Sequence, residues 1–335
     1  MSSFPLTSLP LSRHEVDRDH VSRSRPALFD ELWEEPTTRV LALWKGLALL
    51  TPASVEAAAP AADGWGASAP GTAELDLLPV ERVSAALVRV YLGRTLVATK
   101  TEPAGMAVVL EVLTDAAASE LEPDPGRWGN LRAVATALSD RDAGLFTEAL
   151  AIANWHASNT NCPRCGTPTV VEQAGWVRRC FEDGSEVFPR TDPAVIVSVL
   201  DDDDRLLLGS NAMWEQSRFS LLAGFVEPGE SFESAVEREI FEEAGVRVVD
   251  AEYKGSQPWP FPASVMVGFS ARLAADQAPD ALTPDGEEIL DLRWFSRAEI
   301  WAAREQVILP GRSSIARALI EDWYGGPLDE PPVVP

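Results

Sequence analysis

Three glutamates in the C-terminal half of the chain have a spacing typical of a divalent-metal site. Glu239, Glu242 and Glu243 stand at positions i, i+3 and i+4 of the string EIFEE. If this string is helical, 3.6 residues per turn bring the three carboxylates within an arc of roughly 100° on one face. Like charges so placed repel, and a divalent cation that prefers oxygen ligands turns this repulsion into binding energy. Arg238 is placed to pair with Glu242 and fix its orientation. The alternative is an acidic face turned to solvent.

The three cysteines also have metal-ligand spacing. Cys162 and Cys165 form a CxxC knuckle, and fourteen residues separate Cys165 from Cys180. An odd number of cysteines in one short segment disfavours a secreted disulfide framework and favours a cytosolic metal site. Zinc needs a fourth ligand, and Asp183 is our first choice. Weaker choices are Glu182, Glu186 and His156. A knuckle held by packing, with no zinc, is the alternative.

A proline-rich segment, SQPWPFPASVM, runs from Ser256 to Met266. Its three alternating prolines fix the backbone and present Trp259 and Phe261 as rigid aromatic plates. An ordinary loop with two core aromatics would have the same composition.

The elements that position these residues can be expected from local signals. Pro228-Gly229 predicts a turn, Ser231 an N-cap, and Gly245 the left-handed residue that ends a helix. Between them, apolar residues recur at helical spacing: Phe232, Ala235, Val236 and Ile240. Before this helix in the chain, the patterns predict strands over 194–200 and 205–210 around an acidic turn at 201–204.

The first half of the chain has its own patterns. Residues 39–50 and 85–102 read as strands, with a turn at Gly93, and residues 131–155 carry apolar side chains at helical spacing. Residues 60–72 are rich in Ala, Gly and Pro and predict a loop. This half is therefore expected to be an α+β domain.

The composition is that of a folded globular protein. The 335 residues are 46% hydrophobic and 24% charged, which suits two or three domains and excludes a disordered chain or a disulfide scaffold. The net charge of −24 repels nucleic-acid phosphate unless a bound metal or a basic patch reverses it. We find no secretion signal and no apolar stretch near the ~20 residues that span a bilayer, so we expect a cytoplasmic protein without a membrane partner.

Gly224 to Val246 resembles the Nudix box at every specified position: Gly224, Glu230, Arg238, Glu239, Ile240, Glu242, Glu243, Gly245 and Val246. The resemblance implies an α/β/α sandwich with a mixed sheet, and hydrolysis of a nucleoside diphosphate linked to another moiety with Mg²⁺ or Mn²⁺ as cofactor. It also implies catalytic roles for the box residues. Glu239 and Glu243 would be the principal metal ligands, Glu242 a ligand or water-orienting base, and the Ala223 carbonyl a further ligand.

The SQPWPFPAS string after this box resembles the signature of the NADH pyrophosphatase family. That family cleaves NADH or NAD⁺ between its phosphates, giving AMP and nicotinamide mononucleotide. It carries a Cys₄ zinc ribbon before its catalytic domain and forms homodimers, and in this chain Asp183 stands where the fourth cysteine would be. We therefore expect an N-terminal α+β domain over 1–155, a zinc-ribbon-like segment over 156–190, a Nudix domain over 191–324 and a disordered tail over 325–335.

The same resemblance implies substrate and metal contacts outside the box. Glu288 would join the metal site, with Glu287 as the alternative. Phe188 and Phe225 match aromatic positions around the adenine ring, although either could equally be core. Gly175 stands where the family has an acid. The remaining substrate contacts implied are Arg132, Gln257, Pro258, Trp259, Pro260, Phe261, Pro262, Ala263, Ser264 and Ala316.

Other functions remain open from the sequence. The same bond is cut when an NAD cap is removed from the 5′ end of RNA, and a related dinucleotide such as ADP-ribose is a further possible substrate. A non-enzymatic alternative is a nucleotide-sensing scaffold with an inactive Nudix domain.

Overall fold

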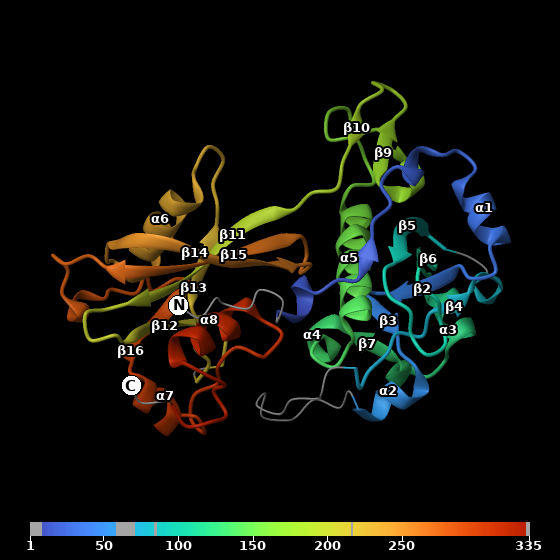
Figure 1. Ribbon diagram of the computed structural model, residues 1–335. Coiled ribbons are helices and arrows are strands. Elements are labelled where there is room, and N and C mark those ends of the chain that lie inside the picture. The colour runs from blue at the N-terminus through green and yellow to red at the C-terminus, as the bar shows by residue number, and fades with distance from the viewer. Residues whose placement is uncertain (1–8, 58–70, 84–85, 216, 333–335) are drawn as a thin grey trace.

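The structure is a computed structural model that describes residues 9–57, 71–83, 86–215 and 217–332. It has two lobes, each built on a mixed sheet, and a small three-stranded unit beside the first lobe (Figure 1). Only Gly71 and Thr72 of the loop predicted at 60–72 fall within these ranges. Short 3-10 turns connect several elements: η2 Pro10–Ser12, η3 Ser22–Ser24, η4 Val80–Arg82, η5 Pro125–Arg127, η6 Gln173–Gly175 and η7 Pro279–Ala281.

The first lobe contains a seven-stranded sheet in the order β1-β5-β6-β2-β3-β7, with β4 paired to β2. Strands β2 and β6 run parallel, and the other pairs are antiparallel. The strands are β1 Val16–Asp17, β2 Arg39–Trp44, β3 Leu47–Leu49, β4 Leu78–Pro79, β5 Val88–Thr95, β6 Ala107–Val112 and β7 Trp128–Asn130. The helices are α1 Leu28–Glu34, α2 Pro52–Ala57, α3 Asp115–Leu121, α4 Leu131–Val134 and α5 Asp140–Ser158.

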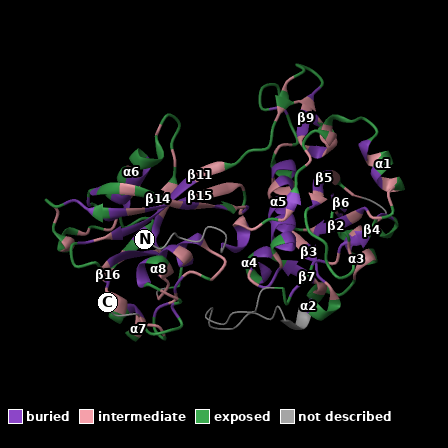
Figure 2. Ribbon diagram, in the orientation of Figure 1, coloured by how far each residue is buried: buried purple, intermediate pink, exposed green. Residues whose placement is uncertain are grey.

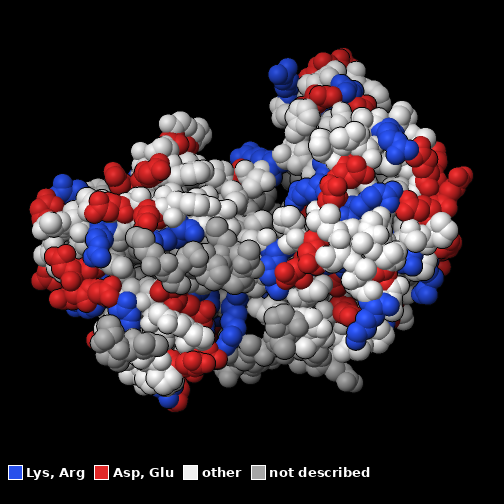
Figure 3. All heavy atoms as spheres, in the orientation of Figure 1, with Lys and Arg blue, Asp and Glu red and all other residues white. Residues whose placement is uncertain are grey.

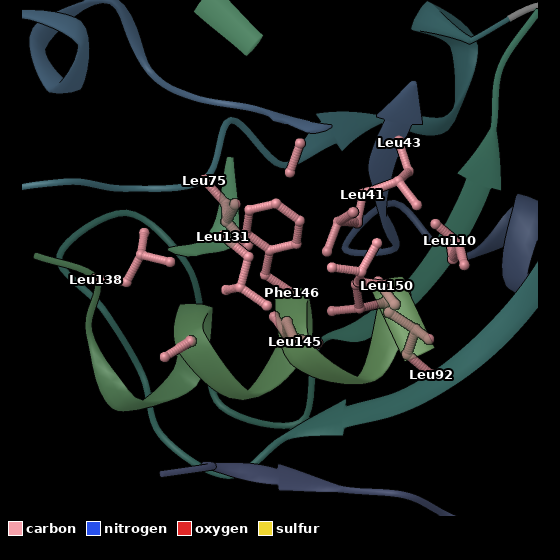
Figure 4. Packing of buried hydrophobic residues seen from close by; sticks show 14 of the residues in the cluster. Leu41, Leu43, Leu75, Leu92, Leu110, Leu131, Leu138, Leu145, Phe146 and Leu150 are labelled. Atoms are coloured by element: carbon pink, nitrogen blue, oxygen red, sulfur yellow. The ribbon is translucent and has the colours of Figure 1, made fainter. Parts of the chain in front are cut away.

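Helix α5 organises the core of this lobe. Phe146 and Leu150 on the helix pack against Leu41 of β2 and Leu110 of β6 (Figure 4). Thirteen of the 19 residues of α5 are buried, which explains why Figure 2 shows the helix purple along most of its length. A helix buried on several sides is covered by more than one neighbour. The sheet, the N-terminal segment and the second lobe all contact it.

Two local predictions for the first lobe are wrong. Gly93 is not at a turn but at a bulge inside β5, with φ of +130°, where an added Cβ would lie 2.1 Å from the Asp17 carbonyl oxygen. The helix predicted over 131–155 is two helices, because Ser139 caps a new one by accepting a hydrogen bond from the Asp142 amide at 3.2 Å.

The small unit follows α5 and consists of strands β8 Thr169–Glu172, β9 Val177–Cys180 and β10 Glu186–Val187 in the order β10-β9-β8. An extended segment then leads across to the second lobe (Figure 1).

The second lobe contains a six-stranded sheet in the order β14-β15-β11-β12-β16, with β13 also paired to β11. Strands β11 and β15 are parallel and the other pairs antiparallel, as the resemblance implied for a mixed sheet. The strands are β11 Asp192–Leu200, β12 Leu206–Asn211, β13 Leu222–Phe225, β14 Val248–Trp259, β15 Ser264–Leu273 and β16 Ile289–Phe295. The helices are α6 Phe232–Ala244, α7 Arg297–Ala302 and α8 Ile315–Tyr324.

Helices α6 and α8 cover opposite faces of this sheet (Figure 1). Val195 and Val197 of β11 belong to one buried cluster with α6, whereas Ile196 belongs to another with α8. This alternation follows from the two-residue period of a strand. The result is three layers, helix, sheet and helix.

The first described residues connect the two lobes. Leu9 is buried in the core beneath α8, while Leu11 is buried in the core of the first lobe. Directly after Leu11, the Ser12 hydroxyl donates a hydrogen bond to the Ser256 carbonyl of the second lobe at 3.1 Å.

The expectation of a disordered tail is wrong for its described part, 325–332. Leu328 is only 1% exposed, Arg312 pairs with Asp329 at 2.8 Å, and the Tyr324 hydroxyl donates to the Glu330 carbonyl at 3.0 Å. These long-range contacts outweigh the proline-rich composition. Within the described ranges, no helix is long and apolar enough to cross a membrane.

Candidate active site and metal-ligand cluster

Helix α6 packs against β13 and brings Glu239 to this strand. Ser231 caps the helix by accepting from the Ser234 amide at 3.1 Å, and Gly245 ends it with φ of +71°. Glu239 lies against the backbone of Gly224 in β13, where an added Cβ would come within 2.0 Å of the Glu239 Cδ. The glycine at this position is therefore required for the carboxylate to approach the strand.

Arg238 holds the acidic cluster together. Its guanidinium donates to both carboxylate oxygens of Glu230 at 2.8 Å, and its Nη1 donates to Glu239 and Glu242 at 2.9 Å. The hydrogen bonds from Arg238 lower the pKa of Glu230 to about 2. The predicted pairing of Arg238 with Glu242 is present, and the arginine fixes two candidate ligands at once.

Glu243 occupies the most buried position of the cluster, with 5% of its surface exposed. Burial, and then the charges of Glu239 and Glu288, raise the pKa of Glu243 to about 8. Its Oε2 has no hydrogen-bond partner among the described residues. Burial also raises the pKa of Glu239, although the hydrogen bond from Arg238 opposes this. A buried carboxylate with a free oxygen among like charges is an arrangement that a cation stabilises.

Glu288 reaches the same site from the loop before β16. Asp285 supports this loop by accepting from the amides of Glu287, Glu288 and Ile289 at 2.8 to 3.0 Å. The Asn211 side chain donates to the Glu288 carboxylate at 3.3 Å. Glu288, and not Glu287, lines the cavities beside α6.

Two cavities meet at these acids. One, of about 420 Å³, extends toward the start of α8, and the other, of about 470 Å³, extends along β13 and α6. Both volumes lie within the range of small-molecule sites, roughly 300–1,000 Å³. The residues that line both cavities are Ala223, Glu243, Trp259, Met266 and Glu288. We refer to the two cavities together as the catalytic cleft.

The proline-rich segment forms the connection between β14 and β15 at the boundary of the lobes. Trp259 and Phe261 meet edge to face, with centroids 5.0 Å apart, and both also pack against the core of the first lobe. The Arg132 guanidinium lies 4.0 Å from the Phe261 ring centroid. The Asn154 side chain donates to the carbonyls of Pro260 and Pro262 at 3.0 Å. The aromatic plates are thus held by the first lobe.

Not every residue of this segment faces the cleft. Gln257 is fully buried: its amide donates to the Ser313 carbonyl at 3.0 Å and its oxygen accepts from the Ile315 amide at 2.8 Å. The expectation that its side chain contacts substrate is not met, because both polar groups anchor α8. Pro258, Pro260 and Ala263 line a third cavity, which lies between the lobes. Ser264 lines both this third cavity and the cleft. Pro262 lines none of the three cavities.

The remaining predicted contacts divide between cleft and surface. Phe225 is 60% exposed and lines the cleft along β13, while Arg132 and Ala316 line the part beside α8. Phe188 is 59% exposed and lines neither part, so this structure does not bring it together with Phe225 at one site.

The cysteine cluster lies in the small three-stranded unit. The ligand atoms of Cys162, Cys165, Cys180 and Asp183 lie within 4.8 Å of one another. Asp183 Oδ1 accepts from the hydroxyl and amide of Ser185 at 2.5 and 2.9 Å, and its Oδ2 lies 3.5 Å from the Cys162 sulfur. Three sulfurs and one oriented carboxylate oxygen fit tetrahedral zinc.

The weaker candidates for the fourth ligand lie outside this cluster. His156 bonds the Gly175 carbonyl through Nε2 at 2.8 Å and accepts from Arg178 through Nδ1 at 3.0 Å. Glu186 pairs with Arg179 at 2.5 Å, and Glu182 is exposed at the surface. Gly175 has φ of +97°, and an added Cβ would lie 2.7 Å from Val90, so the family's acid has no room at this position.

The residues of the cleft that the sequence analysis missed include Asn211, Trp214, Arg218 and Met266. Met266 stands two positions after Ser264 on β15, so the strand period could have placed it on the same face. Asn211 ends β12, one residue beyond the predicted strand. Trp214 and Arg218 follow in a connecting segment that carries no local signal of this kind.

Comparisons with known proteins agree with this arrangement. Residues 190–317 match the NUDIX domain, residues 37–155 the NADH pyrophosphatase-like rudimentary NUDIX domain, and residues 158–188 the NADH pyrophosphatase zinc ribbon domain. The three-layer lobe and its glutamate-bearing helix therefore define a Nudix hydrolase.

Among curated relatives, the NAD-capped RNA hydrolase NudC of Mycobacterium bovis is 42% identical over 283 residues, covering 78% of this chain and 88% of the relative. The Mycobacterium tuberculosis protein of the same name has the same identity and coverage. Human NAD-capped RNA hydrolase NUDT12 is 34% identical over 200 residues, covering 56% of this chain and 42% of the relative. The chain belongs to the NADH pyrophosphatase family of Nudix hydrolases. Membership in a family of hydrolases disfavours the alternative of a non-enzymatic scaffold.

Proposed function

We propose that this protein hydrolyses the pyrophosphate bond of NADH and NAD⁺, giving AMP and the reduced or oxidised nicotinamide mononucleotide. The observation that carries the proposal is the junction of the two cavities at Glu243 and Glu288. A dinucleotide has two nucleosides joined by a charged bridge, and this cleft has two parts joined at an acidic centre. The bridge would lie at the acids with one nucleoside on either side.

Mg²⁺ or Mn²⁺ fits the acidic centre because Glu243 has a buried oxygen without a hydrogen-bond partner in the described chain. The candidate ligands are Glu239, Glu242, Glu243, Glu288 and the Ala223 carbonyl. When bound, such ions neutralise phosphoryl oxygens and make a bound water more acidic. They also offset the repulsion between the −24 chain and an anionic substrate.

The protein's own groups would orient the reactants. Arg238 holds Glu239 and Glu242 in fixed positions by hydrogen bonds, and Glu242, which is 58% exposed on its side chain, is the candidate for orienting the attacking water. Trp259 and Phe225 offer aromatic faces for a base. Positioning of this kind supplies much of the rate gain in phosphoryl transfer.

A second substrate is the NAD cap at the 5′ end of RNA. The curated relatives at 42% identity carry the name NAD-capped RNA hydrolase, and the bond cut is the same. In Figure 3 several Lys and Arg side chains border the hollow between the two lobes, which favours the approach of a short single-stranded end despite the net negative charge.

The test is a product profile. Protein stripped with EDTA and reloaded with Mg²⁺ or Mn²⁺ is incubated with NADH, NAD⁺, ADP-ribose, and NAD-capped and 5′-triphosphate RNA, and products are separated by chromatography. We expect AMP with nicotinamide mononucleotide from NADH and NAD⁺, 5′-monophosphate RNA from the capped strand, and no change in triphosphate RNA. Turnover of ADP-ribose alone would refute the proposed substrate class.

Zinc at Cys162, Cys165, Cys180 and Asp183, a homodimer and a cytoplasmic location are further parts of the proposal. We also retain the division at 1–155, 156–190 and 191–324, without counting 325–335 as a disordered tail. Light scattering on the purified protein tests the dimer.

A further inference from the structure

A third cavity, of about 240 Å³, lies between the lobes on the other side of the proline-rich segment from the acidic centre. It is formed by α5, the N-terminal segment, the end of the three-stranded unit and the β14–β15 connection. We refer to it as the interlobe cavity. Neither the Nudix box nor the cysteine cluster contributes a residue to it.

Two side chains of α5 that line this cavity each have one oxygen without a hydrogen-bond partner among the described residues. The Glu148 side chain is 4% exposed, its Oε1 has no hydrogen-bond partner, and its Oε2 lies 3.7 Å from the Arg18 Nε. Thr147 is 6% exposed, and its hydroxyl also lacks a partner. A buried carboxylate oxygen left unpaired is costly, so a ligand that brings N–H donors to it gains that energy.

The rest of the lining combines apolar surface with polar and basic side chains, among them Arg13, which pairs with Asp140. Leu11, Ile152, Trp176 and Val265 supply apolar or aromatic surface. Arg18 and Arg190 keep 60% and 76% of their side chains exposed, although Arg190 also pairs with Asp192. Such a site fits a compact ring with N–H donors at one end and a negative group at the other.

The volume of the cavity and the need for N–H donors on the ligand limit the chemical class of ligand. A cavity of about 240 Å³ lies below the range of roughly 300–1,000 Å³ for drug-sized ligands, so it suits one base and not a dinucleotide. Guanine presents a ring N–H and an amino group side by side, which one carboxylate accepts together. Adenine presents an acceptor nitrogen beside its amino group, which a carboxylate repels. We propose that the interlobe cavity binds a guanine nucleotide, with its base on Glu148 and its phosphate toward Arg18 and Arg190.

The interlobe cavity also touches the catalytic cleft. Trp259 and Ser264 line both. A ligand in the interlobe cavity would therefore contact the back of the wall that bounds the cleft. The proposal does not depend on which dinucleotide the cleft hydrolyses.

The experiment is calorimetric titration of the full-length protein in EDTA, which removes the divalent ions that a phosphate would need at the acidic centre. The probes are GMP, AMP, and short RNAs with a 5′-phosphoguanosine or a 5′-phosphoadenosine. We expect GMP to bind at least tenfold more tightly than AMP. Guanine-dependent binding of RNA without binding of GMP would identify the RNA end as the source of the same base.

Variants locate the binding. Glu148→Gln is expected to weaken GMP binding at least tenfold, and Thr147→Val, which keeps the side-chain shape, severalfold. The matched control Glu120→Gln changes an exposed glutamate of α3 and is expected to leave GMP binding unchanged. Circular dichroism verifies that each variant is folded, and Thr147→Val decides the matter if Glu148→Gln does not fold. Equal affinity for GMP and AMP, or GMP binding unaffected by the α5 variants, would overturn the proposal.

Discussion

The carboxylate of Glu239 lies against the backbone of Gly224 with no space for a methyl group between them. An added Cβ on Gly224 would lie 2.0 to 2.2 Å from the three terminal atoms of that side chain. The first glycine of the Nudix box and Glu239, fifteen positions apart in sequence, therefore fit together as one contact. The contact fixes where α6 presents its acids relative to β13.

This contact makes Gly224→Ala a test of acid placement. The methyl group must displace the Glu239 carboxylate, and a shift of about 1 Å at a catalytic group can cost roughly 10²-fold in rate. We expect hydrolysis of NADH to fall by about that factor. Gly326→Ala is the control, because no atom of the described chain lies within 4 Å of its added Cβ. Equal steady-state rates for both variants would contradict the assigned role of the contact.

Glu243→Gln tests the buried acid. The amide has nearly the same shape but no charge to offer a cation, so we expect kcat to fall by roughly 10²-fold or more with Mg²⁺. Because burial already disfavours the charged form, the melting temperature in EDTA should not decrease. Glu237→Gln, at an exposed position of the same helix, should retain full activity. Unchanged turnover in Glu243→Gln would place the chemistry elsewhere.

Zinc content tests the fourth ligand of the cysteine cluster. After dialysis with a weak chelator and a reductant, the wild-type protein should retain about one zinc per chain, as a four-ligand site requires. Asp183→Ala should lose most of it, and Asp183→Cys, which restores a fourth sulfur, should retain it. Glu182→Ala is the control at an exposed neighbour. Atomic absorption measures each; full zinc in Asp183→Ala would rule out the carboxylate as a ligand.

The buried position of His156 predicts that the folded protein loses stability in acid. Burial, together with the positive charge of Arg178, lowers the pKa of His156 from 6.5 to about 4, although the hydrogen bond to Gly175 opposes this. The unfolded chain therefore binds more protons than the folded one between these values, so stability falls as pH decreases from about 6.5 toward 4.

Chemical denaturation at several pH values measures this contribution. His156→Gln should be less stable than wild type at pH 7, and the difference should shrink as the pH approaches 4.5. His20→Gln, at an exposed histidine, should follow the wild-type profile throughout. A constant difference between His156→Gln and wild type would show that this side chain does not titrate as described.

The sequence predicts best where a feature depends on neighbours along the chain. Helix α6 begins and ends where Ser231 and Gly245 indicated, because caps act within one turn. The bulge at Gly93 depends instead on the approach of Asp17, and the order of the tail depends on contacts of Leu328 and Asp329 with distant residues. Patterns of local composition carry no information on such contacts.

The residues of the candidate site also fall into those that the local sequence predicts and those that depend on the tertiary structure. Its acids on α6 are contiguous and were predicted together, and Glu288 was found only through the resemblance to the family. Gln257 was assigned to substrate because it lies in a signature, yet its neighbours across the fold, Ser313 and Ile315, occupy both of its polar groups. A motif indicates that a residue matters, while the tertiary structure decides whether it touches substrate or supports a helix.

The placement of Leu9 and Leu11 in different cores has a practical consequence for anyone dividing this chain into fragments. Leu9 and Leu11 are only 1% and 2% exposed, so the short segment between them ties the two cores together. A shortened protein that starts at residue 37, where the match to the rudimentary domain begins, would lack both leucines and leave a cavity in each core. The lobes could then hinge apart, and the wall that Trp259 and Phe261 build between them would be released.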